Sequence, residues 1–199
     1  MIELKPVSHY DPRYKFMRGR HYIPDRSTIG MQLHYLVMLD QTQVGIISAA
    51  SPTWAVKPRD EFFGLDLHPG KRGAQLRHIV NNSVFRLEYH EKNLGTQVLS
   101  LFRKRVTYDW WHKYSVQLCG FETFVEPSEQ RHGSLYKADN WTEVGMTKGH
   151  AKLQKGVKVT GQGNVSRAPT SQKLIYCKWN RKVSSLPQVT YKHQFKLDL

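Results

Sequence analysis

A chain of 199 residues with 30 lysines and arginines against 16 aspartates and glutamates carries a formal net charge of +14, and its pI is near 9.8. Its hydrophobic content of 39% and mean hydropathy of −0.58 are typical of a soluble globular domain, and no apolar run approaches the roughly 18 residues that a membrane span needs. The charge predicts a polyanionic partner, with nucleic acid as the default and a merely solubilising surface as the alternative.

The distribution of charge and the two cysteines give further information on the cellular compartment in which the protein works. From residue 144 to residue 199 the chain has 11 lysines and arginines and a single acid, Asp198. Cys119 and Cys177 lie in apolar, strand-like runs without a CxxC or Cys/His cluster, which predicts buried, reduced thiols and no metal site on them. Charged residues interrupt the N-terminal segment, so we expect no signal peptide. These observations predict a cytoplasmic protein, or one in the cytoplasm of the host cell if a phage encodes it.

The first fifty residues predict a short helix and a hairpin. After a polar lead-in over residues 1–15, residues 14–22 have the pattern of a short basic helix, which Pro24 ends. Apolar and polar residues then alternate over residues 31–39 and again up to the small residues that close the segment 44–50. This pattern predicts two antiparallel strands joined by a tight turn.

Residues 52–63 are predicted to form a loop, and residues 64–73 continue it. Lys57 and Arg59 alternate there with aromatic residues that include Trp54. Cations for phosphate and a ring for an unstacked base are what a DNA-contacting loop needs. A plain surface loop, anchored by its two phenylalanines, is the alternative.

The middle of the chain reads as strand, helix, strand and short helix, and the rest is organised around it. These four elements are predicted at residues 84–90, 98–111, 116–125 and 134–141. The helix has apolar residues at helical spacing from Leu99 to Trp110, and we expect Trp110 and Trp111 to close it against the core. Glu122 stands inside the apolar second strand. Because burying an unpaired charge costs several kcal/mol, this carboxylate is expected to have a partner or a task.

The C-terminal quarter of the chain predicts two more strands, at residues 142–146 and 173–179. Residues 147–172, between them, are rich in glycine, serine and lysine without an acid, which is typical of a mobile basic segment that orders on DNA. We therefore predict one domain over residues 1–180, followed by a basic tail over residues 181–199.

Five short motifs of this chain match a known family. They are Arg20-His21-Tyr22, Phe85-Arg86-Leu87-Glu88, Asn93-Leu94-Gly95-Thr96-Gln97, Phe121-Glu122-Thr123-Phe124-Val125-Glu126 and Leu135-Tyr136-Lys137-Ala138-Asp139-Asn140-Trp141. With them, residues 15–150 resemble the phage Mom-type family, which converts adenine in DNA to N6-(carbamoylmethyl)adenine and so protects phage DNA from host restriction. A more distant similarity, in the Asn81-Asn82 pair and residues 136–141, extends to a phage-defence family, the Druantia A component.

The order of the elements resembles the core of the GNAT acyltransferases. This resemblance implies a single-domain α/β fold with a mixed, mostly antiparallel central sheet flanked by helices. In that fold a strand, a helix N-terminus and a second, splayed strand hold the acyl donor, and amides of a glycine-rich loop hold the pyrophosphate of coenzyme A. Only Gly95 remains of that loop motif here. The departure argues against acetyl-CoA and leaves the donor open between a glycyl-tRNA and an acyl-CoA.

The catalytic candidates are His21, Tyr22, Glu88, Glu122, Glu126 and Tyr136. The resemblance places His21 and Tyr22 at the active site, where a histidine can shuttle a proton. A histidine satisfied within the core is the alternative for His21. Tyr136 matches a tyrosine that in GNAT enzymes protonates the leaving group, and a phenol with a pKa of about 10 suits that role. Glu122 or Glu126 is the expected base.

The substrate-binding candidates are Arg86, Asn93, Thr96, Asn140 and Trp141, and the DNA-binding candidates are Arg20, Arg26, Trp54, Lys57, Arg59 and Arg131. Asn140 can read the edge of adenine, with a helix C-cap as the alternative. Trp141 either stacks on the base or belongs to the core. Arg86 and Glu88, two residues apart on one strand face, either pair with each other or flank the substrate.

Together these features predict an enzyme that modifies adenine in double-stranded DNA, with the base flipped out of the duplex. The partners implied are double-stranded DNA and, as glycyl donor, an aminoacyl-tRNA. The adenine amine would attack an activated carbonyl, and a rearrangement through C6 of the purine would give the carbamoylmethyl product. A GNAT acetyltransferase of a protein or small molecule, and a DNA-binding defence protein without chemistry, are the alternatives. The sequence predicts neither a metal requirement nor an oligomeric state.

Overall fold

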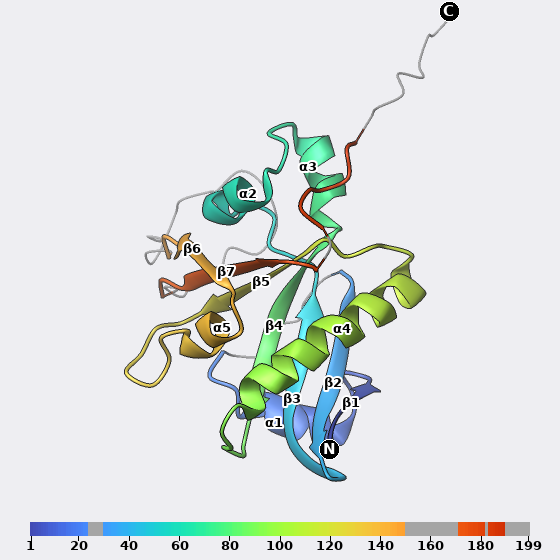
Figure 1. Ribbon diagram of the computed structural model, residues 1–199, viewed down its shortest axis with the longest axis vertical. Coiled ribbons are helices and arrows are strands. Elements are labelled where there is room, and N and C mark those ends of the chain that lie inside the picture. Colours follow the sequence, from blue (N-terminus) through green and yellow to red (C-terminus); the bar gives the residue numbers. More distant parts are fainter. Residues whose placement is uncertain (24–29, 150–170, 182, 190–199) are drawn as a thin grey trace, which may run out of the picture.

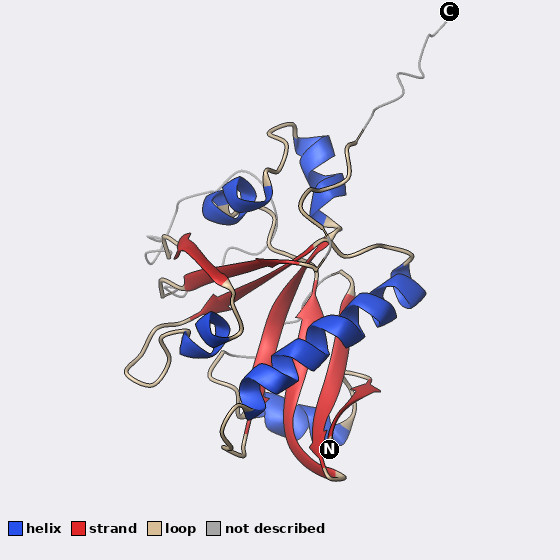
Figure 2. Ribbon diagram, viewed as in Figure 1, coloured by secondary structure: helices blue, strands red, loops and turns tan. Residues whose placement is uncertain are grey.

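The computed structural model describes residues 1–23, 30–149, 171–181 and 183–189. Its strands are β1 Ile2–Val7, β2 Gln32–Leu39, β3 Thr42–Ala50, β4 Ile79–Leu87, β5 Gly120–Val125, β6 Thr142–Met146 and β7 Leu174–Trp179. Its helices are α1 Pro12–Gly19, α2 Lys57–Phe63, α3 Pro69–Leu76, α4 Leu94–Tyr114 and α5 Ser134–Ala138. The strands form one sheet in the order β1-β2-β3-β4-β5-β7-β6, with helices on both faces (Figure 1, Figure 2). The predicted mixed, mostly antiparallel α/β sheet is confirmed, with β4 and β5 as its parallel pair.

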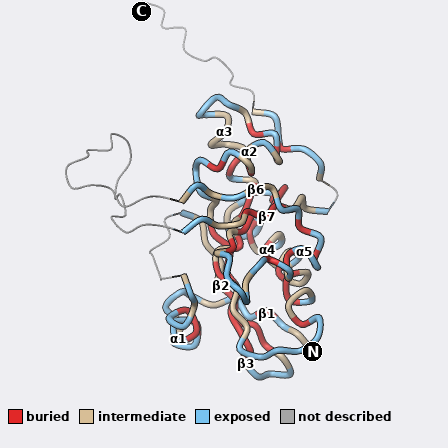
Figure 3. The backbone as a smooth tube through the Cα atoms, turned by 90° about the vertical axis from the view of Figure 1, so that its left-hand side faces the viewer, coloured by how far each residue is buried: buried red, intermediate tan, exposed pale blue. Residues whose placement is uncertain are grey.

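The long helix α4 crosses one face of the sheet (Figure 1). The apolar positions that recur from Leu99 to Trp110 are fully buried and pack into the main core cluster, as their spacing predicts. Trp111 differs from the expectation, because it lies on the opposite side of the helix and is exposed. Buried positions gather along the strands beneath the helices (Figure 3).

The second face of the sheet is covered by α1. Tyr35 and Val37 of β2 belong to the cluster under α4, whereas Leu36 and Met38 belong to a separate cluster with Tyr14 of α1. Side chains alternate between the two faces of a strand, so a strand covered on both faces needs apolar residues at successive positions. This requirement explains the unbroken apolar run in the middle of β2.

Three elements were not predicted from the sequence. The polar lead-in contains β1, an edge strand whose Leu4 is buried while its neighbours face solvent. The two segments predicted as loops contain α2 and α3, which have Pro58 and Pro69 in their first turns. Proline fixes a φ angle suited to a helix start, so these residues begin helices here rather than marking a loop. Across the described ranges, no helix has the length and apolar content needed to cross a membrane.

Several predicted segments fall partly outside the described residues. These are residues 150–170 of the basic segment and residues 182 and 190–199 of the tail. In the described part of the tail, Leu186 is buried in the cluster formed by α2, α3 and β7. The first residues of the tail therefore pack against the domain.

The parallel strands β4 and β5 are paired over a short distance. Their register joins Ile79 to Gly120, Val80 to Phe121 and Asn81 to Glu122, and it ends there, although β4 continues to Leu87 and β5 to Val125. The two strands therefore part at their C-terminal ends. Helix α5 lies beside this opening, between β5 and β6 in the sequence (Figure 1).

Replacing Gly133 with alanine is expected to destabilise the protein by about 3 kcal/mol, because two penalties combine. Gly133 precedes α5 with a φ of 75°, and an added Cβ would run into the Tyr176 ring. Gly64→Ala is the matched control, since its φ is 62° but the space around it is open. We expect the control to lose only about 1 kcal/mol. Urea unfolding measures both, and equal losses would contradict the tight packing of Tyr176 on the start of α5.

Candidate functional site

A cavity of about 210 Å³ lies where β4 and β5 part. Side chains from three regions form its wall: the segment after α1, the two diverging strands, and α5 with the loop before it. The wall includes the side chains of six residues: His21, Tyr22, Asn82, Thr123, Arg131 and Tyr136. His21, Tyr22, Arg131 and Tyr136 were site or DNA-binding candidates from the sequence, and Asn82 belongs to the Asn81-Asn82 pair of the Druantia A resemblance. Thr123 had been given no role.

A hydrogen-bonded network of Asn82, Thr123 and Tyr136 forms the buried wall of the cavity. The Tyr136 hydroxyl donates to Asn82 Oδ1 at 2.9 Å, and Thr123 Oγ1 lies 3.0 Å from the Asn82 carbonyl oxygen and 3.4 Å from the Tyr136 hydroxyl. Asn82 Nδ2 donates to the carbonyl oxygens of Ser48 and Val84. Because both ends of the Asn82 amide are engaged, the phenol of Tyr136 is held in one orientation.

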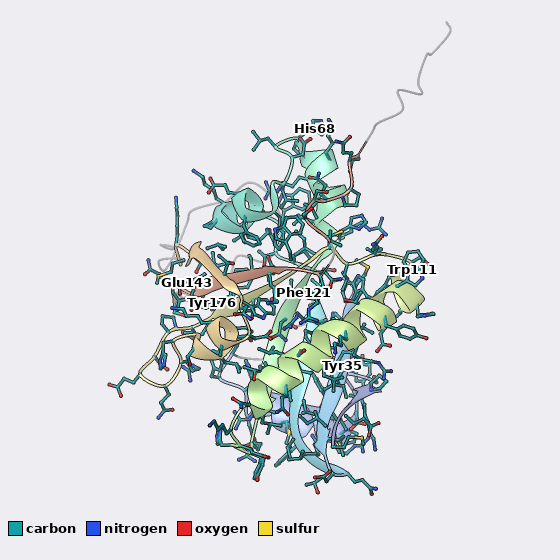
Figure 4. All side chains as sticks on the ribbon, in the orientation of Figure 1. Tyr35, His68, Trp111, Phe121, Glu143 and Tyr176 are labelled. Atoms are coloured by element: carbon teal, nitrogen blue, oxygen red, sulfur yellow. The ribbon has the colours of Figure 1, made fainter. Side chains whose placement is uncertain are left out.

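The environment keeps Tyr136 protonated. Burial raises the pKa of its phenol well above the ordinary value, and the hydrogen bond with Thr123 opposes this only in part. The Tyr136 ring stacks on Tyr176 of β7 with 5.7 Å between ring centroids. Tyr176 lies next to Glu143 (Figure 4). The group that faces the cavity is therefore a neutral, rigidly placed hydroxyl, which can accept or donate a hydrogen bond.

His21 lines the cavity as a neutral imidazole. Burial, helped by the nearby Arg18 cation, lowers the pKa of His21 to about 4. The Ile23 amide donates to Nδ1 at 3.1 Å, and a second backbone hydrogen bond joins the ring to Phe85 of β4. His21 therefore anchors the segment after α1 to the sheet. The prediction that this residue shuttles protons stays a prediction.

Lowering the pH from 7 to 5 is expected to destabilise the protein through His21. Its pKa is about 4 in the folded state and about 6.5 in an unfolded chain, so the unfolded chain binds the proton first. The stabilisation is fully present above the unfolded pKa and is lost as the pH falls toward the folded one. We expect a loss of about 1 kcal/mol at pH 5, after discounting for partial exposure.

Urea unfolding at the two pH values measures this loss. Other acidic groups titrate in the same range, so the comparison is between the wild type and His21→Gln, in which the pH effect should shrink. The exposed His112→Gln serves as control and should keep the wild-type pH dependence. An identical response of all three proteins would show that His21 is not held neutral.

Tyr22 and Arg131 lie at the mouth of the cavity. The Arg131 guanidinium lies 4.1 Å from the centroid of the Tyr22 ring, a cation–π contact between segments that are far apart in the sequence. Arg131 also reaches the carbonyl oxygen of Glu126, with 3.4 Å between Nε and O. Burial raises the pKa of Tyr22, so its phenol is neutral. His21 stacks on the Tyr22 ring with 4.5 Å between centroids, so the mouth presents a cation held on a stacked pair of rings, which suits an anionic ligand.

The three glutamates proposed as catalytic do not meet at this cavity. Glu88 pairs with Arg86, with Nε and Oε1 2.8 Å apart, and this contact lowers the pKa of Glu88. Arg86 and Glu88 therefore pair with each other, which is one of the two alternatives predicted from the sequence. Glu126 accepts a hydrogen bond from Ser171. In the described part of the chain, the cavity wall carries no carboxylate.

Glu122 has a partner rather than a place at the cavity. Its carboxylate forms an ion pair with Arg59 of α2, and both side chains are fully buried. Strand alternation explains the location, because Thr123 faces the cavity and its neighbour Glu122 points to the opposite side of β5. Burial raises the pKa of Glu122, and the Arg59 cation opposes the rise. The expectation that Arg59 contacts DNA is wrong, because its guanidinium is closed off from solvent.

The N-terminus of α4 is built differently from a phosphate-binding loop. Asn93 precedes the helix with a φ of 65°, and Thr96 Oγ1 donates back to the Asn93 carbonyl oxygen at 2.9 Å. An added Cβ on Gly95 would lie 2.6 Å from Leu135 Cδ1. The missing side chain of Gly95 therefore lets α5 pack closely against the first turn of α4.

Asn140 and Trp141 serve the structure of α5. Asn140 has a φ of 57° directly after the helix and is exposed, which agrees with the C-cap alternative. Trp141 is buried in the main core, and its Nε1 donates to Asp139 Oδ2 at 2.7 Å. Lys178 donates to the carbonyl oxygens of Asp139 and Asn140. Neither candidate therefore lines the cavity.

The remaining DNA-binding candidates lie in two places. Arg20 is exposed near the mouth of the cavity, with its Nε 3.6 Å from Glu88 Oε1. Trp54 and Lys57 are exposed at α2, where Arg72 lies over the Trp54 ring. Arg26 lies outside the described residues. Within those residues, no group of histidines, cysteines and acids has the arrangement of a metal site.

Sequence reasoning missed Thr123, His132 and Ser83 as wall residues. For Thr123, the signal in the sequence was its position two residues after Phe121, because that spacing places both side chains on the same face of the strand. His132 belongs to a polar loop that was expected to reach DNA, without a role of its own. Ser83 carries no signal, because its place in the wall depends on where β5 leaves β4.

Comparisons with known proteins add a family and a fold. The sequence profile of the family described as "Druantia protein DruA" matches residues 2–177. A search of curated proteins finds no significant match. The structure is similar to a GNAT family acetyltransferase from Elizabethkingia anophelis with acetyl-CoA bound, at 8% identity and a TM-score of 0.54, over 90% of this chain and 98% of that one.

Two further solved structures agree. The ribosomal-protein-S5-alanine acetyltransferase from Vibrio fischeri has 14% identity and a TM-score of 0.51, over 92% of this chain and 95% of its own. The ribosomal-protein-S18-alanine N-acetyltransferase from Escherichia coli has 8% identity and a TM-score of 0.51, over 98% and 99%. These similarities show the GNAT fold alone. The profile supports the more distant of the two sequence resemblances, and the Mom-type resemblance stays a prediction.

Proposed function

Because the chain belongs to the family of the Druantia protein DruA and has the GNAT fold, we propose that it is a transferase that modifies adenine in double-stranded DNA. The carbamoylmethyl group is the modification that the motifs favour. The adenine would leave the duplex and enter the cavity between β4 and β5.

The observation that carries the proposal is the chemistry of this cavity. Its volume of about 210 Å³ equals that of about seven liquid waters, the size of one ring system rather than a whole nucleotide. Its wall presents a neutral phenol, an amide and a threonine hydroxyl, which suit the polar edge of a base. At the mouth, the Arg131 cation, held over the Tyr22 ring, is available to the phosphate that adjoins the base.

The charge of the chain supports DNA as the substrate. A net charge of +14 gives strong, salt-dependent attraction to a polyanion. Flipping a base costs a few kcal/mol, which backbone contacts around the mouth must offset. Arg20, next to His21 in the sequence, and Arg131, at the mouth itself, are described cations placed to make such contacts. These contacts supply binding energy for a flipped base.

A glycyl ester is the donor class that we favour, because only Gly95 remains of the glycine-rich loop that holds the coenzyme A pyrophosphate in GNAT enzymes. The exocyclic amine attacks the ester carbonyl, a C–N bond forms, the C–O bond breaks, and one proton passes from the amine to the leaving oxygen. Tyr136 is the proton carrier in this step, because its neutral hydroxyl is held at the cavity wall by Asn82. The glycyl amine then attacks C6 of the purine, the original C6–N bond breaks, and that nitrogen becomes the terminal carboxamide.

Nucleoside mass spectrometry on DNA from cells that express this chain tests the proposal. We expect an adenine nucleoside heavier by a carbamoylmethyl group, absent from cells with an empty vector. Purified protein with DNA and acetyl-CoA alone should give no modified adenine. Modification under those conditions would overturn the glycyl donor, and unmodified DNA in cells that contain folded protein would overturn the enzymatic function.

A DNA-binding defence protein without chemistry is the second candidate. The specific observation in its favour is that no described carboxylate lines the cavity, so no side chain there is an evident strong base. Such a protein would bind DNA with full affinity and leave the nucleoside composition unchanged. The Arg131→Ala variant should weaken DNA binding whether the protein is an enzyme or a DNA-binding protein without chemistry. Only for the enzyme should the variant also lower the yield of modified adenine.

A further inference from the structure

The outer face of α4 carries a stripe of aromatic and basic side chains that the proposed function does not use. We define the α4 stripe as Lys104, Tyr108, Trp111 and His112. Tyr108 is 62% exposed and Trp111 is 55% exposed, and Lys104 and His112 are exposed as well. Spacings of three and four residues place these side chains on one side of the helix. The opposite side of α4 is the one buried against the sheet.

The α4 stripe lies far from the cavity. The cavity lies by the N-terminal end of α4, where Gly95 meets Leu135. Trp111 is 17 positions after Leu94, which is about 26 Å along a helix. Figure 4 shows Trp111 at the end of α4 that lies far from α5. A ligand of the stripe therefore does not occupy the cavity.

The surroundings of the stripe are cationic. Arg105 and Lys113 flank it on α4, and the helix has one acid, Asp109. That carboxylate already accepts hydrogen bonds from Arg105 Nε at 2.7 Å and from the Tyr35 hydroxyl at 3.0 Å. The charge that α4 offers to a partner is therefore positive.

The combination of exposed rings and cations identifies the ligand class. Bases of a duplex are stacked on each other and offer no free face, whereas unpaired bases stack on exposed tryptophan and tyrosine. Tyr108 and His112 already lie ring to ring, with 4.1 Å between centroids, which fixes one ring as a platform. We propose that the α4 stripe binds single-stranded DNA. We commit to DNA rather than RNA because the proposed function places this chain on DNA; this choice rests on the proposed function, and oligo(rU) tests the alternative.

Fluorescence anisotropy with a labelled ten-residue oligo(dT) tests this proposal. Each base stacked on an aromatic side chain contributes about 1–3 kcal/mol, so Tyr108→Ala/Trp111→Ala should weaken binding about tenfold to a hundredfold or more. The affinity for a duplex of the same length should change less than twofold. Lys104→Ala should reduce the slope of log Kd against log salt by about 0.7.

Tyr10→Ala is the matched control, because Tyr10 is 67% exposed and next to Lys15 at α1, on the other face of the sheet. It should bind the oligonucleotide as the wild type does. Tyr136→Phe should also keep single-strand binding, so failure of the proposed modification activity would not be mistaken for failure of the stripe. Wild-type affinity in the double variant, no binding of oligo(dT) by the wild type, or tighter binding of oligo(rU) would each overturn the proposal.

Discussion

Replacing Arg59 with methionine is expected to lower the free energy of unfolding by about 3–5 kcal/mol. The guanidinium is fully buried and makes three contacts: with Glu122, with Asp60 at 2.6 Å and with the Thr53 carbonyl oxygen at 2.6 Å. Methionine keeps most of the apolar stem and removes every donor. The variant then leaves Glu122 buried without a cation, and a further rise in the pKa of its carboxyl only partly relieves the cost.

Urea unfolding of three variants tests this prediction. Lys57→Ala lies on the same helix but is exposed, and its contact with Glu61 at 3.7 Å is a surface pair, so it should change stability by less than about 0.5 kcal/mol. The double variant Arg59→Met/Glu122→Leu removes both charges and should recover most of the loss. If Arg59→Met behaved like Lys57→Ala, the buried ion pair would not be what joins α2 to β5.

Removing the buried ion pair also distinguishes a structural role of Arg59 from a role in DNA binding. Lys57 and Arg59 were both expected to contact phosphate, and burial leaves only Lys57 able to do so. A folded double variant, Arg59→Met/Glu122→Leu, should therefore bind DNA with the salt dependence of the wild type. Lys57→Ala remains the variant that tests the phosphate contact.

What could be predicted from the sequence follows the periodicity of the chain. The buried side of α4 and the strands β2, β3 and β7 have regular apolar patterns over enough residues to identify them. β1 was missed because only one of its residues is buried. α2 and α3 were missed because helices of 7 and 8 residues are too short to show a periodic apolar pattern, and the proline in the first turn of each is as typical of a loop as of a helix start. Local patterns cannot distinguish these two uses of proline.

The candidate site shows a second limit of prediction from sequence. A local pattern does not tell which face of the sheet the odd-numbered and the even-numbered side chains of a strand occupy. Glu122 was recognised as an anomaly that needs a partner, but its partner lies 63 residues away in a segment predicted to be a DNA-contacting loop. Thr123 lies at the cavity only because β5 turns its odd-numbered side chains that way. A one-residue difference decides which face a side chain occupies, so membership of the motif alone did not place Glu122.

Replacing Tyr136 with phenylalanine is expected to reduce the yield of modified adenine by about 10²- to 10⁴-fold while the protein stays folded. The variant keeps the ring, its stacking on Tyr176 and its packing against Trp141, and loses only the hydroxyl at the cavity wall. Asn82 Oδ1 is left without its donor, which should cost about 1–2 kcal/mol of stability. Nucleoside mass spectrometry and urea unfolding measure the two effects on the same protein.

Tyr176→Phe separates the chemical role of Tyr136 from a structural one. Tyr176 is the stacking partner of Tyr136, and its hydroxyl donates to Glu143 Oε2 at 2.9 Å and lies 3.2 Å from the His132 carbonyl oxygen. Removing that hydroxyl should cost a similar amount of stability, but it does not line the cavity. We therefore expect near-normal product from Tyr176→Phe and almost none from Tyr136→Phe. If both variants lost product in proportion to their stability, the Tyr136 hydroxyl would hold the wall of the cavity in place without carrying a proton.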